Sequence, residues 1–274
     1  MSWRCQRFRP PGVEHVSVWD LPLGTGLFWE RVGASRVAAL RRAGVADPAI
    51  AASLAGDLAA ALERLQARLG FGLAWLGGGL LGLTGLTDVL ARTAPCPVAF
   101  CDSGRFVGLN GGSRLLTQRG QAGGAIVDVG QSAIKACAAS RRVIVERDLV
   151  ALPLRLITPD GRSDTAPPGA AASFIAAAVT TIAPSDPCVL LALPGPLGDT
   201  LVPGPCSYGW QGDATLVPGL LRLLDAGLPR PGGEVFLLND AELAALSARA
   251  DTRVSLHPRI LALTLGFGPG AALC

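Results

Sequence analysis

The amino-acid sequence predicts an α/β protein, because segments typical of buried strands alternate with segments typical of amphipathic helices. Half of the 274 residues are hydrophobic and only 16% are charged, a composition that favours a folded core over disorder. The 35 glycines and 21 prolines suit a fold with many tight connections. A chain of this length can form one large or two medium-sized domains with a buried core.

In the first part of the chain, the strongest helix prediction covers residues 47–69. Asp47 can cap this helix, Pro48 suits its first turn, and apolar residues recur every three to four positions. Residues 69–86 carry no charge, but their seven glycines favour a strand that enters a glycine-rich turn over a membrane span. The other elements expected here are strands at 71–76 and 97–101 and helices at 86–92 and 108–116.

Residues 117–124 are polar and rich in glycine, which predicts a linker between two domains, 1–120 and 121–274. Two closely spaced strands follow, and their spacing predicts a hairpin with Gly130, Gln131 and Ser132 at its tip. The elements expected after the linker are strands at 125–129, 133–139, 143–148, 188–193, 234–238 and 260–265 and helices at 170–183, 216–226 and 241–250.

The composition also excludes several classes of protein. A net charge of +3, without a block of basic residues, argues against nucleic acid as a partner. The seven cysteines are odd in number and form no CxxC pair, so reduced thiols in a cytoplasmic protein are expected and a zinc ribbon is not. Residues 1–11 contain no apolar run, so neither a secretion signal nor membrane attachment is expected.

The clearest candidate for chemistry is the sequence DVGQSAIK, from Asp128 to Lys135. A carboxylate at a strand end can hold Mg²⁺ through water, and a tight turn directs backbone N–H groups toward phosphate oxygens. Lys135 is the single lysine of the chain, and it lies within this motif. The motif therefore predicts a phosphate site.

Three further junctions carry glycine or polar residues where strands end. Asn239 and Asp240 follow a strand and open a helix, where Asp240 can accept a proton from a hydroxyl group or the pair can simply cap the helix. Residues 265–270 form a second glycine turn, and Gly77–Gly79 can let a planar ligand approach the backbone. Each junction alone is ordinary loop chemistry, and only their combination points to phosphoryl transfer.

In combination, these motifs resemble those of the ROK family of sugar kinases and repressors. DVGQSAIK is similar to the first phosphate motif of that family, and LTLGFGPGAA at 263–272 is similar to the second. Residues 192–196 (ALPGP) resemble its A-x-P-G-P segment, Gly209-Trp210 its G-W pair, and residues 238–241 (LNDA) its catalytic E-N-D-A motif.

The remaining family landmarks resemble segments nearer the start of the chain. They are Gly12–His15, Leu27–Glu30 with Ala34-Ser35, Leu76–Gly79 and Gly108–Gly112. All landmarks follow the cyclic order of the family, with the cut after the second phosphate turn, and chains tolerate such permutation where their ends can be joined. The resemblance thus implies a two-lobed, actin-like (ribonuclease H-like) sugar-kinase fold that is circularly permuted. Residues 1–120 would be the sugar and adenosine lobe, and 121–274 the phosphate and catalytic lobe.

The resemblance also implies roles for individual residues in an ATP- and Mg²⁺-dependent transfer of phosphate to a hexose or related sugar. Asp240 would be the general base and Asp128 the Mg²⁺ ligand. The implied sugar contacts are Asn239, Glu14, His15, Glu30 and Gly195. The implied contacts to the nucleotide are Gly130, Gln131, Ser132, Lys135, Gly266, Phe267 and Gly268 at the phosphates and Gly77, Gly78 and Gly79 at the adenosine.

The sequence departs from the family pattern at several of these positions. Gln131 and Ser132 replace Gly and Thr in the first phosphate motif, and Phe267 and Pro269 replace the hydroxyl residue and an Ile in the second. Loss of one donor to the transferred phosphate typically costs about a hundredfold or more in rate. The zinc-binding cysteines of the family are missing, so no structural zinc is expected.

These departures leave a second class of function open, a non-catalytic pseudokinase that binds sugar or nucleotide as a sensor or scaffold. A repressor is disfavoured, because only about a dozen residues precede the first matching motif, too few for a helix-turn-helix module. Polyphosphate in place of ATP as the donor, and a homodimer as the assembly, are further open alternatives.

Overall fold

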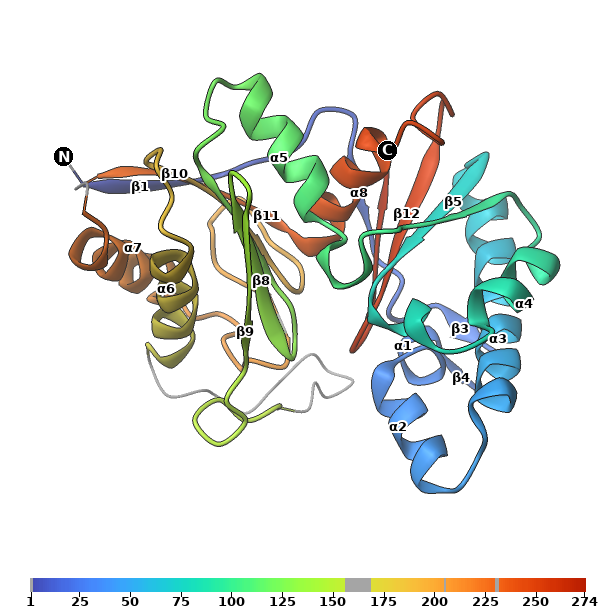
Figure 1. Ribbon diagram of the computed structural model, residues 1–274. Helices are drawn as coiled ribbons and strands as arrows, with labels where there is room; N and C mark the ends of the chain where they lie inside the picture. The colour runs from blue at the N-terminus through green and yellow to red at the C-terminus, as the bar shows by residue number, and fades with distance from the viewer. Residues whose placement is uncertain (1, 156–168, 205, 230–231) are drawn as a thin grey trace. The chain divides into compact units, whose positions relative to one another are not determined.

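The computed structural model describes residues 2–155, 169–204, 206–229 and 232–274 (Figure 1). They form two compact units, the first made of residues 1–10 and 112–243 and the second of residues 11–111 and 244–274. Each unit has a mixed sheet with helices packed against it, which confirms the α/β class. None of the helices in the described ranges is long and apolar enough to cross a membrane.

The sheet of the first unit has the strand order β1-β11-β10-β7-β8-β9. Its strands are β1 (Trp3–Arg7), β7 (Ala125–Val129), β8 (Ala133–Ala138), β9 (Arg141–Glu146), β10 (Cys188–Leu193) and β11 (Gly233–Asn239). Neighbours from β1 to β7 run parallel, whereas β7, β8 and β9 form an antiparallel meander. β10 and most of β7 are buried apolar runs, as is typical of strands covered on both faces.

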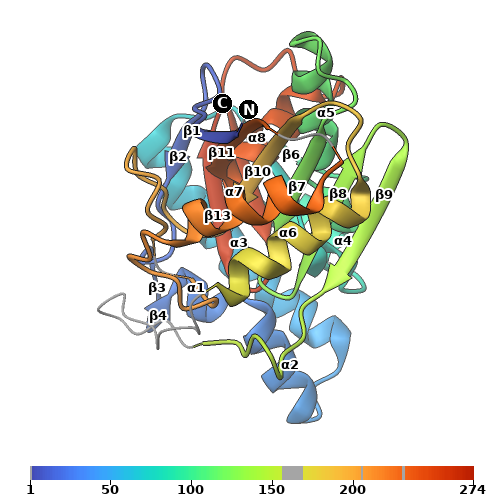
Figure 2. The same ribbon diagram turned by 90° about the vertical axis from the view of Figure 1, so that its left-hand side faces the viewer.

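Two helices of the first unit, α6 (Ala170–Ile182) and α7 (Leu216–Gly227), lie side by side over one face of this sheet (Figure 2). Apolar side chains on one stripe of each helix, such as Ile175 and Leu220, are buried with Leu191 of the sheet in a single core. This core fixes the strands whose ends carry the candidate site.

The sheet of the second unit has the strand order β2-β13-β12-β5-β6. Its strands are β2 (Glu14–Val16), β5 (Leu73–Gly77), β6 (Val98–Phe100), β12 (Ile260–Leu265) and β13 (Pro269–Leu273). A small hairpin is formed by β3 (Pro22–Leu23) and β4 (Gly26–Leu27). Because β12 and β13 lie between β2 and β5, residues from both ends of the chain complete this sheet.

The longest helix of the second unit is α3 (Asp47–Leu69), which begins and ends where the sequence predicts. The expected cap by Asp47 is wrong, because the N-cap residue is Ala46 and the Asp47 carboxylate accepts hydrogen bonds from Arg41. The helix ends at Gly70, whose φ of 65° is the left-handed conformation of a helix C-cap, and its buried stripe faces the core. The other helices are α1 (Phe28–Arg31), α2 (Ala34–Arg42), α4 (Leu86–Thr93) and the 3₁₀ turns Gly79–Gly82 and Gly104–Phe106.

Two helices, α5 (Leu109–Gln118) and α8 (Asp240–Ala250), each contain residues of both units. In the part that belongs to the second unit, the two helices touch at Gly111, whose N–H donates to Ser247 Oγ over 2.9 Å. A Cβ at Gly111 would overlap the backbone of Leu246 and Ser247. Glycine at this position is therefore required for the approach of α5 to α8.

The structure confirms the strands and helices expected from residue 47 onward to within a few residues, but it differs from the sequence analysis elsewhere. Strands β1, β2, β3, β4 and β13 and helices α1 and α2 are not predicted from the sequence. Helix α5 continues to Gln118, into the segment expected to be a linker. The units also differ from the expected division at residues 120 and 121. Residues 1–10 join the first unit because β1 pairs with β11, and residues 244–274 join the second because β12 pairs with β5.

Candidate functional site

The carboxyl ends of three neighbouring parallel strands bring the principal candidate residues of the first unit together. In register, Ala192 of β10 is opposite Asp128 of β7, and Leu193 is opposite Asn239 of β11. Asp128, the loop after β10 with Gly195, and Asp240 therefore lie at one edge of the sheet. In open α/β sheets this edge is where ligands bind.

Asp128 is opposite Lys135 in the β7–β8 hairpin. The Lys135 Nζ atom lies 3.5 Å from Asp128 Oδ2, and both side chains are largely buried, with exposed fractions of 18% and 14%. A Cβ at Gly130 would collide with Lys135 Nζ, so the glycine makes room for the ammonium group. The hairpin thus places one carboxylate and one ammonium group beside its glycine turn.

Asp240 is the first residue of α8 and is partly exposed. Burial among its neighbours raises the pKa of this carboxyl from 3.8 to about 7, and the negative charge of Asp128 contributes in the same direction. Its Oδ1 accepts a hydrogen bond from the N–H of Ala241 over 2.8 Å, and no described residue bonds to Oδ2. A carboxylate with a pKa near neutrality and a free oxygen suits a general base.

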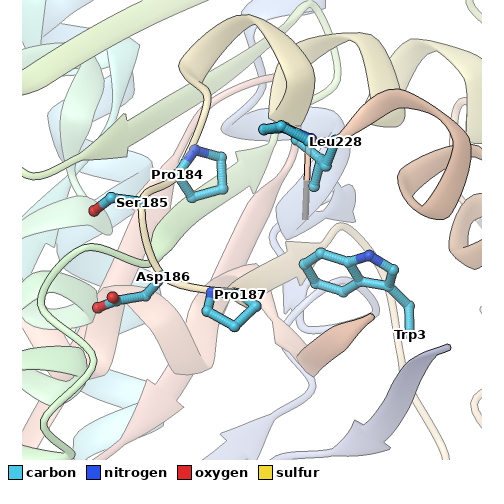
Figure 3. A pocket seen from close by; sticks show the side chains of 7 residues that line it. Trp3, Pro184, Ser185, Asp186, Pro187 and Leu228 are labelled. Atoms are coloured by element: carbon cyan, nitrogen blue, oxygen red, sulfur yellow. The ribbon is translucent and has the colours of Figure 1, made fainter. Parts of the chain in front are cut away.

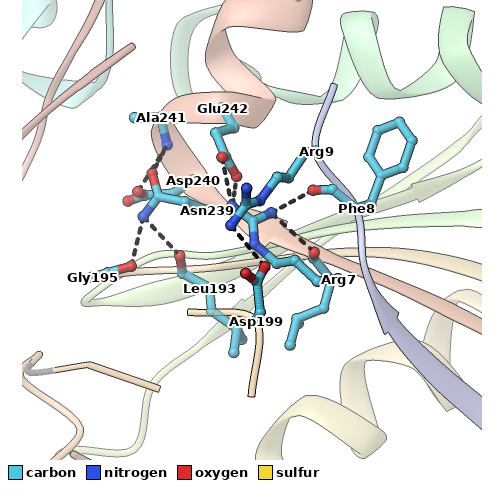
Figure 4. A network of polar contacts seen from close by, with 11 residues as sticks. Arg7, Phe8, Arg9, Leu193, Gly195, Asp199, Asn239, Asp240, Ala241 and Glu242 are labelled. Carbon is cyan, nitrogen blue, oxygen red and sulfur yellow. Dashed lines mark hydrogen bonds and ion pairs between the residues drawn. The ribbon is translucent and has the colours of Figure 1, made fainter. Parts of the chain in front are cut away.

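The neighbouring Asn239 has a different role, because its polar atoms are bonded within the protein (Figure 4). Its side chain accepts from the N–H of Ala241 at 2.8 Å and donates to the carbonyl oxygen of Gly195 at 2.6 Å. Glu242 accepts from the N–H of Asn239 at 2.8 Å and pairs with Arg7 at 2.6 Å. The helix-cap interpretation of Asn239 is therefore confirmed, and the side chain also holds the loop that contains Gly195.

At the hairpin tip, three successive carbonyl groups are held by two residues that the sequence analysis did not identify. Tyr208 Oη donates to the carbonyl oxygen of Gly130 over 2.7 Å. A guanidinium N–H of Arg147 donates to the carbonyl oxygen of Gln131, and the backbone N–H of Arg147 donates to that of Ser132, both over 2.9 Å. Because a trans peptide points its N–H opposite to its C=O, the N–H groups of Gln131 and Ser132 face away from Arg147 and Tyr208.

Arg147 is buried, and its guanidinium group also donates to the backbone oxygens of Leu152, Pro153 and Ser207 and to Ser207 Oγ. The guanidinium carbon lies 3.8 Å from the ring centroid of Tyr208. Burial lowers the pKa of this group, and its neutral partners stabilise its charge by hydrogen bonding and by the cation–π contact. An arginine directly after a strand is typical of an exposed loop, so no signal in the sequence marked this residue.

Three of the expected sugar contacts belong to the second unit. Glu14 and His15 lie on β2, opposite Leu273 and Ala272 of β13, and both are exposed. Glu30 Oε2 accepts from the N–H of Leu27 over 2.8 Å, as expected of a carboxylate at a helix N-terminus. Glu14 and Asp240 thus belong to different units, and a crevice shared by the two stays a prediction.

The expected adenosine turn, Gly77–Gly79, is required by the packing of the chain itself. A Cβ at Gly77 would collide with the side chain of Val107, and one at Gly78 would overlap the backbone of Leu265. Gly78 also has a φ of 113°, which only glycine adopts readily. Gly79 has open space around it and is the member of the turn with room for a ligand.

The second glycine turn, Gly266–Gly268, joins β12 to β13. The carbonyl oxygen of Gly266 accepts from the N–H of Ala34 over 3.0 Å, and a Cβ at Gly268 would collide with the ring of Trp19. Trp19 stacks on Trp29, with ring centroids 5.8 Å apart. Phe267 lies between these glycines and is partly exposed. The glycine at 268 thus accommodates an indole ring of the protein itself.

A cavity of about 160 Å³ lies at the opposite, amino ends of the parallel strands of the first unit (Figure 3). It is lined by Trp3, Pro184, Ser185, Asp186, Pro187, Leu228 and Pro229. Its carboxylate, Asp186, accepts from the N–H of Gly123 over 2.8 Å. The lining is mainly apolar and brings no pair of acid and base together among these residues, so the candidate residues for chemistry remain those at the carboxyl ends of the strands.

Within the described ranges, no group of three or more His, Cys, Asp or Glu side chains could hold a metal ion. Asp128 and Asp240 supply two carboxylates. Proteins commonly hold Mg²⁺ with one or two carboxylates together with substrate phosphates and water. In comparisons with known proteins, no protein-family model and no curated protein matches the chain. The site is therefore interpreted from its own chemistry.

Proposed function

We propose that the protein is an ATP- and Mg²⁺-dependent phosphotransferase that acts on a hydroxyl group of a hexose or related sugar, with a circularly permuted, actin-like fold. The observation that carries the proposal is the placement of Asp128 and Asp240 at the carboxyl ends of parallel strands, beside the hairpin with Lys135. The raised pKa of Asp240 and the resemblance of the motifs to the ROK family support it.

In the proposed reaction, a sugar hydroxyl oxygen forms a bond to the γ-phosphorus of ATP while the bond from that phosphorus to the β–γ bridging oxygen breaks. The hydroxyl proton passes to the free oxygen of Asp240, and ADP leaves with the bridging oxygen. Asn239 acts indirectly, because it caps α8 and holds the loop of Gly195 beside Asp240. Such a site works mainly by positioning its reactants.

The residues fit a magnesium ion, since two carboxylates face the same edge and phosphate oxygens would complete the ligand set. Asp128 would hold the ion, which neutralises charge on the phosphates when bound. The Lys135 Nζ atom lies 3.5 Å from Asp128 Oδ2 and compensates the charge of that carboxylate in the hairpin.

The test is ADP release from ATP and Mg²⁺ with a panel of hexoses and related sugars. Sugar-dependent release is expected for the natural protein and a loss of at least about a hundredfold for D240N, because the proton acceptor is removed. D199N is the matched control, since Asp199 is an exposed carboxylate of the same unit that pairs with Arg9. Turnover that is absent with every sugar, or unchanged in D240N, contradicts the proposal.

A second candidate is a pseudokinase that binds sugar or nucleotide without turnover. Two features of the second glycine turn favour it. Phe267 and Pro269 leave this turn without the hydroxyl donor that the transferred phosphate needs. The close approach of Trp19 to Gly268 also shows that the turn packs against the protein itself. Calorimetry separates the two candidates. Sugar binding without ATP binding favours the pseudokinase, whereas ATP binding with turnover excludes it.

A further inference from the structure

The side chain of Gln131 is anchored at one end only. Its Oε1 atom accepts from the N–H of Ser207 over 3.3 Å and from Ser207 Oγ, while Ser207 Oγ itself accepts from Arg147 over 2.9 Å. No described residue accepts from the Gln131 Nε2 atom, and this nitrogen is not among the buried polar atoms that lack a partner. The amide oxygen is therefore held within the protein, and the amide nitrogen presents its hydrogens to solvent.

The free donors at the hairpin tip form a group. The backbone N–H groups of Gln131 and Ser132 and the hydroxyl of Ser132 also have no partner among the described residues. The carbonyls of the same peptides are held by Tyr208 and Arg147, which fixes the direction of these N–H groups. Successive amide groups of this kind, held without internal partners, bind anions such as phosphate.

We propose that the Gln131 side-chain amide is a phosphate-binding group, positioned through its oxygen by Ser207 and Arg147. It supplies a donor at a position where a glycine of the resembled motif has no side chain. The inference rests on the proposed function for the kind of ligand, a chain of phosphates.

The charged side chains next to the hairpin favour binding of a phosphate chain as its Mg²⁺ complex over binding of the free anion. Asp128 and Asp240 repel an anion, and Lys135 attracts it while lying 3.5 Å from Asp128. Arg147 directs its N–H groups at oxygens of the protein and not at a ligand, so it is a positioning residue. Binding of a phosphate chain is therefore expected to be tighter with Mg²⁺ than without it.

The test is calorimetry of the full chain with tripolyphosphate and Mg²⁺, a probe that needs neither sugar nor turnover. The Q131E variant keeps an oxygen for Ser207 but replaces the free amide nitrogen by a second oxygen, so binding should weaken about tenfold or more. Q131G removes the donor and should also weaken binding. Q121E is the matched control, because Gln121 lies in the same unit and its Oε1 accepts from Cys188 Sγ, and it should bind as the natural protein does.

A direct readout separates phosphate contact from a structural role. The side-chain NH₂ signals of Gln131 in a ¹⁵N NMR spectrum, identified by their absence in Q131E, should shift on addition of tripolyphosphate. Three results would each overturn the inference. They are Gln131 side-chain signals that do not shift while tripolyphosphate binds, a Q131G variant that binds tripolyphosphate as tightly as the natural protein or more tightly, and a natural protein that does not bind it. Binding that depends on Gln131 without sugar-dependent ADP release would support the inference while contradicting the proposed function.

Discussion

Asn239 and Asp240 are neighbours in the sequence, but their surroundings give them different chemistry. Asn239 is 2% exposed and bonds through both ends of its amide to the backbone of its own helix and of the Gly195 loop. Asp240 is partly exposed, has one free oxygen and carries a carboxyl with a raised pKa. The first residue thus builds the site, and the second is available for reaction.

The raised pKa of Asp240 predicts a dependence of stability on pH. Well below pH 3.8 the carboxyl is protonated in both the folded and the unfolded protein, so it has little effect on stability. Between its unfolded pKa of 3.8 and its folded pKa of about 7, only the unfolded chain releases the proton, so stability falls as pH rises. D240N should match the natural protein near pH 4 and exceed it by about 2 kcal/mol at pH 8, a value reduced for partial exposure.

Urea unfolding at a series of pH values without Mg²⁺ measures this difference. D199N is again the control, because Asp199 and Arg9 form an exposed pair that contributes little to stability. A difference between D240N and the natural protein that stays constant from pH 4 to pH 8 contradicts the prediction.

At the scale of the element, the sequence predicted those strands and helices whose apolar pattern is strong. Helix α3 and strands β7, β10 and β12 carry long apolar runs or stripes and were predicted within a few residues. Strand β1 (WRCQR) alternates polar and apolar residues at a sheet edge, and β13 (PGAAL) opens with Pro-Gly. Such segments become strands because they pair with other strands in the folded protein, and their local sequence does not reveal this pairing.

The contact between α5 and α8 supports a prediction at the same scale. G111A should destabilise the protein by about 3 kcal/mol, because its methyl group would overlap the backbone of Leu246, which has no side-chain freedom to yield. G56A is the control, since Gly56 is exposed in the middle of α3 with open space around its Cα. It should stabilise the protein by about 0.5–1 kcal/mol. Thermal unfolding of both variants tests the contrast, and equal effects of the two substitutions contradict it.

At the scale of the whole molecule, the sequence predicted part of the candidate site. The motif from Asp128 to Lys135 and the Asn239–Asp240 junction meet at one sheet edge, since β7, which contains Asp128, and β11, which precedes Asp240, both run parallel to β10. Arg147 and Tyr208 reach the same site from a strand end and a distant loop. Tyr208 is 78 positions from Gly130, and Ser207, which accepts from Arg147, is 60 positions from that arginine. Periodicity and spacing do not report such contacts.

The discontinuous make-up of the units gives the last prediction. A fragment of residues 11–111 contains β2, β5 and β6 but lacks β12 and β13, which lie between β2 and β5 in the sheet. In this fragment β2 has no partner and β5 pairs only with β6, so most of the ladder hydrogen bonds and much of the core are lost. The fragment alone should give a collapsed amide NMR spectrum, typical of an unfolded chain.

The fragment of residues 112–243 is the matched comparison. Its sheet keeps the order β11-β10-β7-β8-β9 and loses the edge strand β1, with the buried ring of Trp3, while helices α5 and α8 are shortened. It should therefore give a dispersed spectrum but unfold at lower urea concentration than the full chain, because a buried tryptophan is removed from its core. A dispersed spectrum from residues 11–111 alone would show that β12 and β13 are not needed to form the second sheet. Loss of structure in 112–243 would show that the edge strand is required to hold the strands of the candidate site.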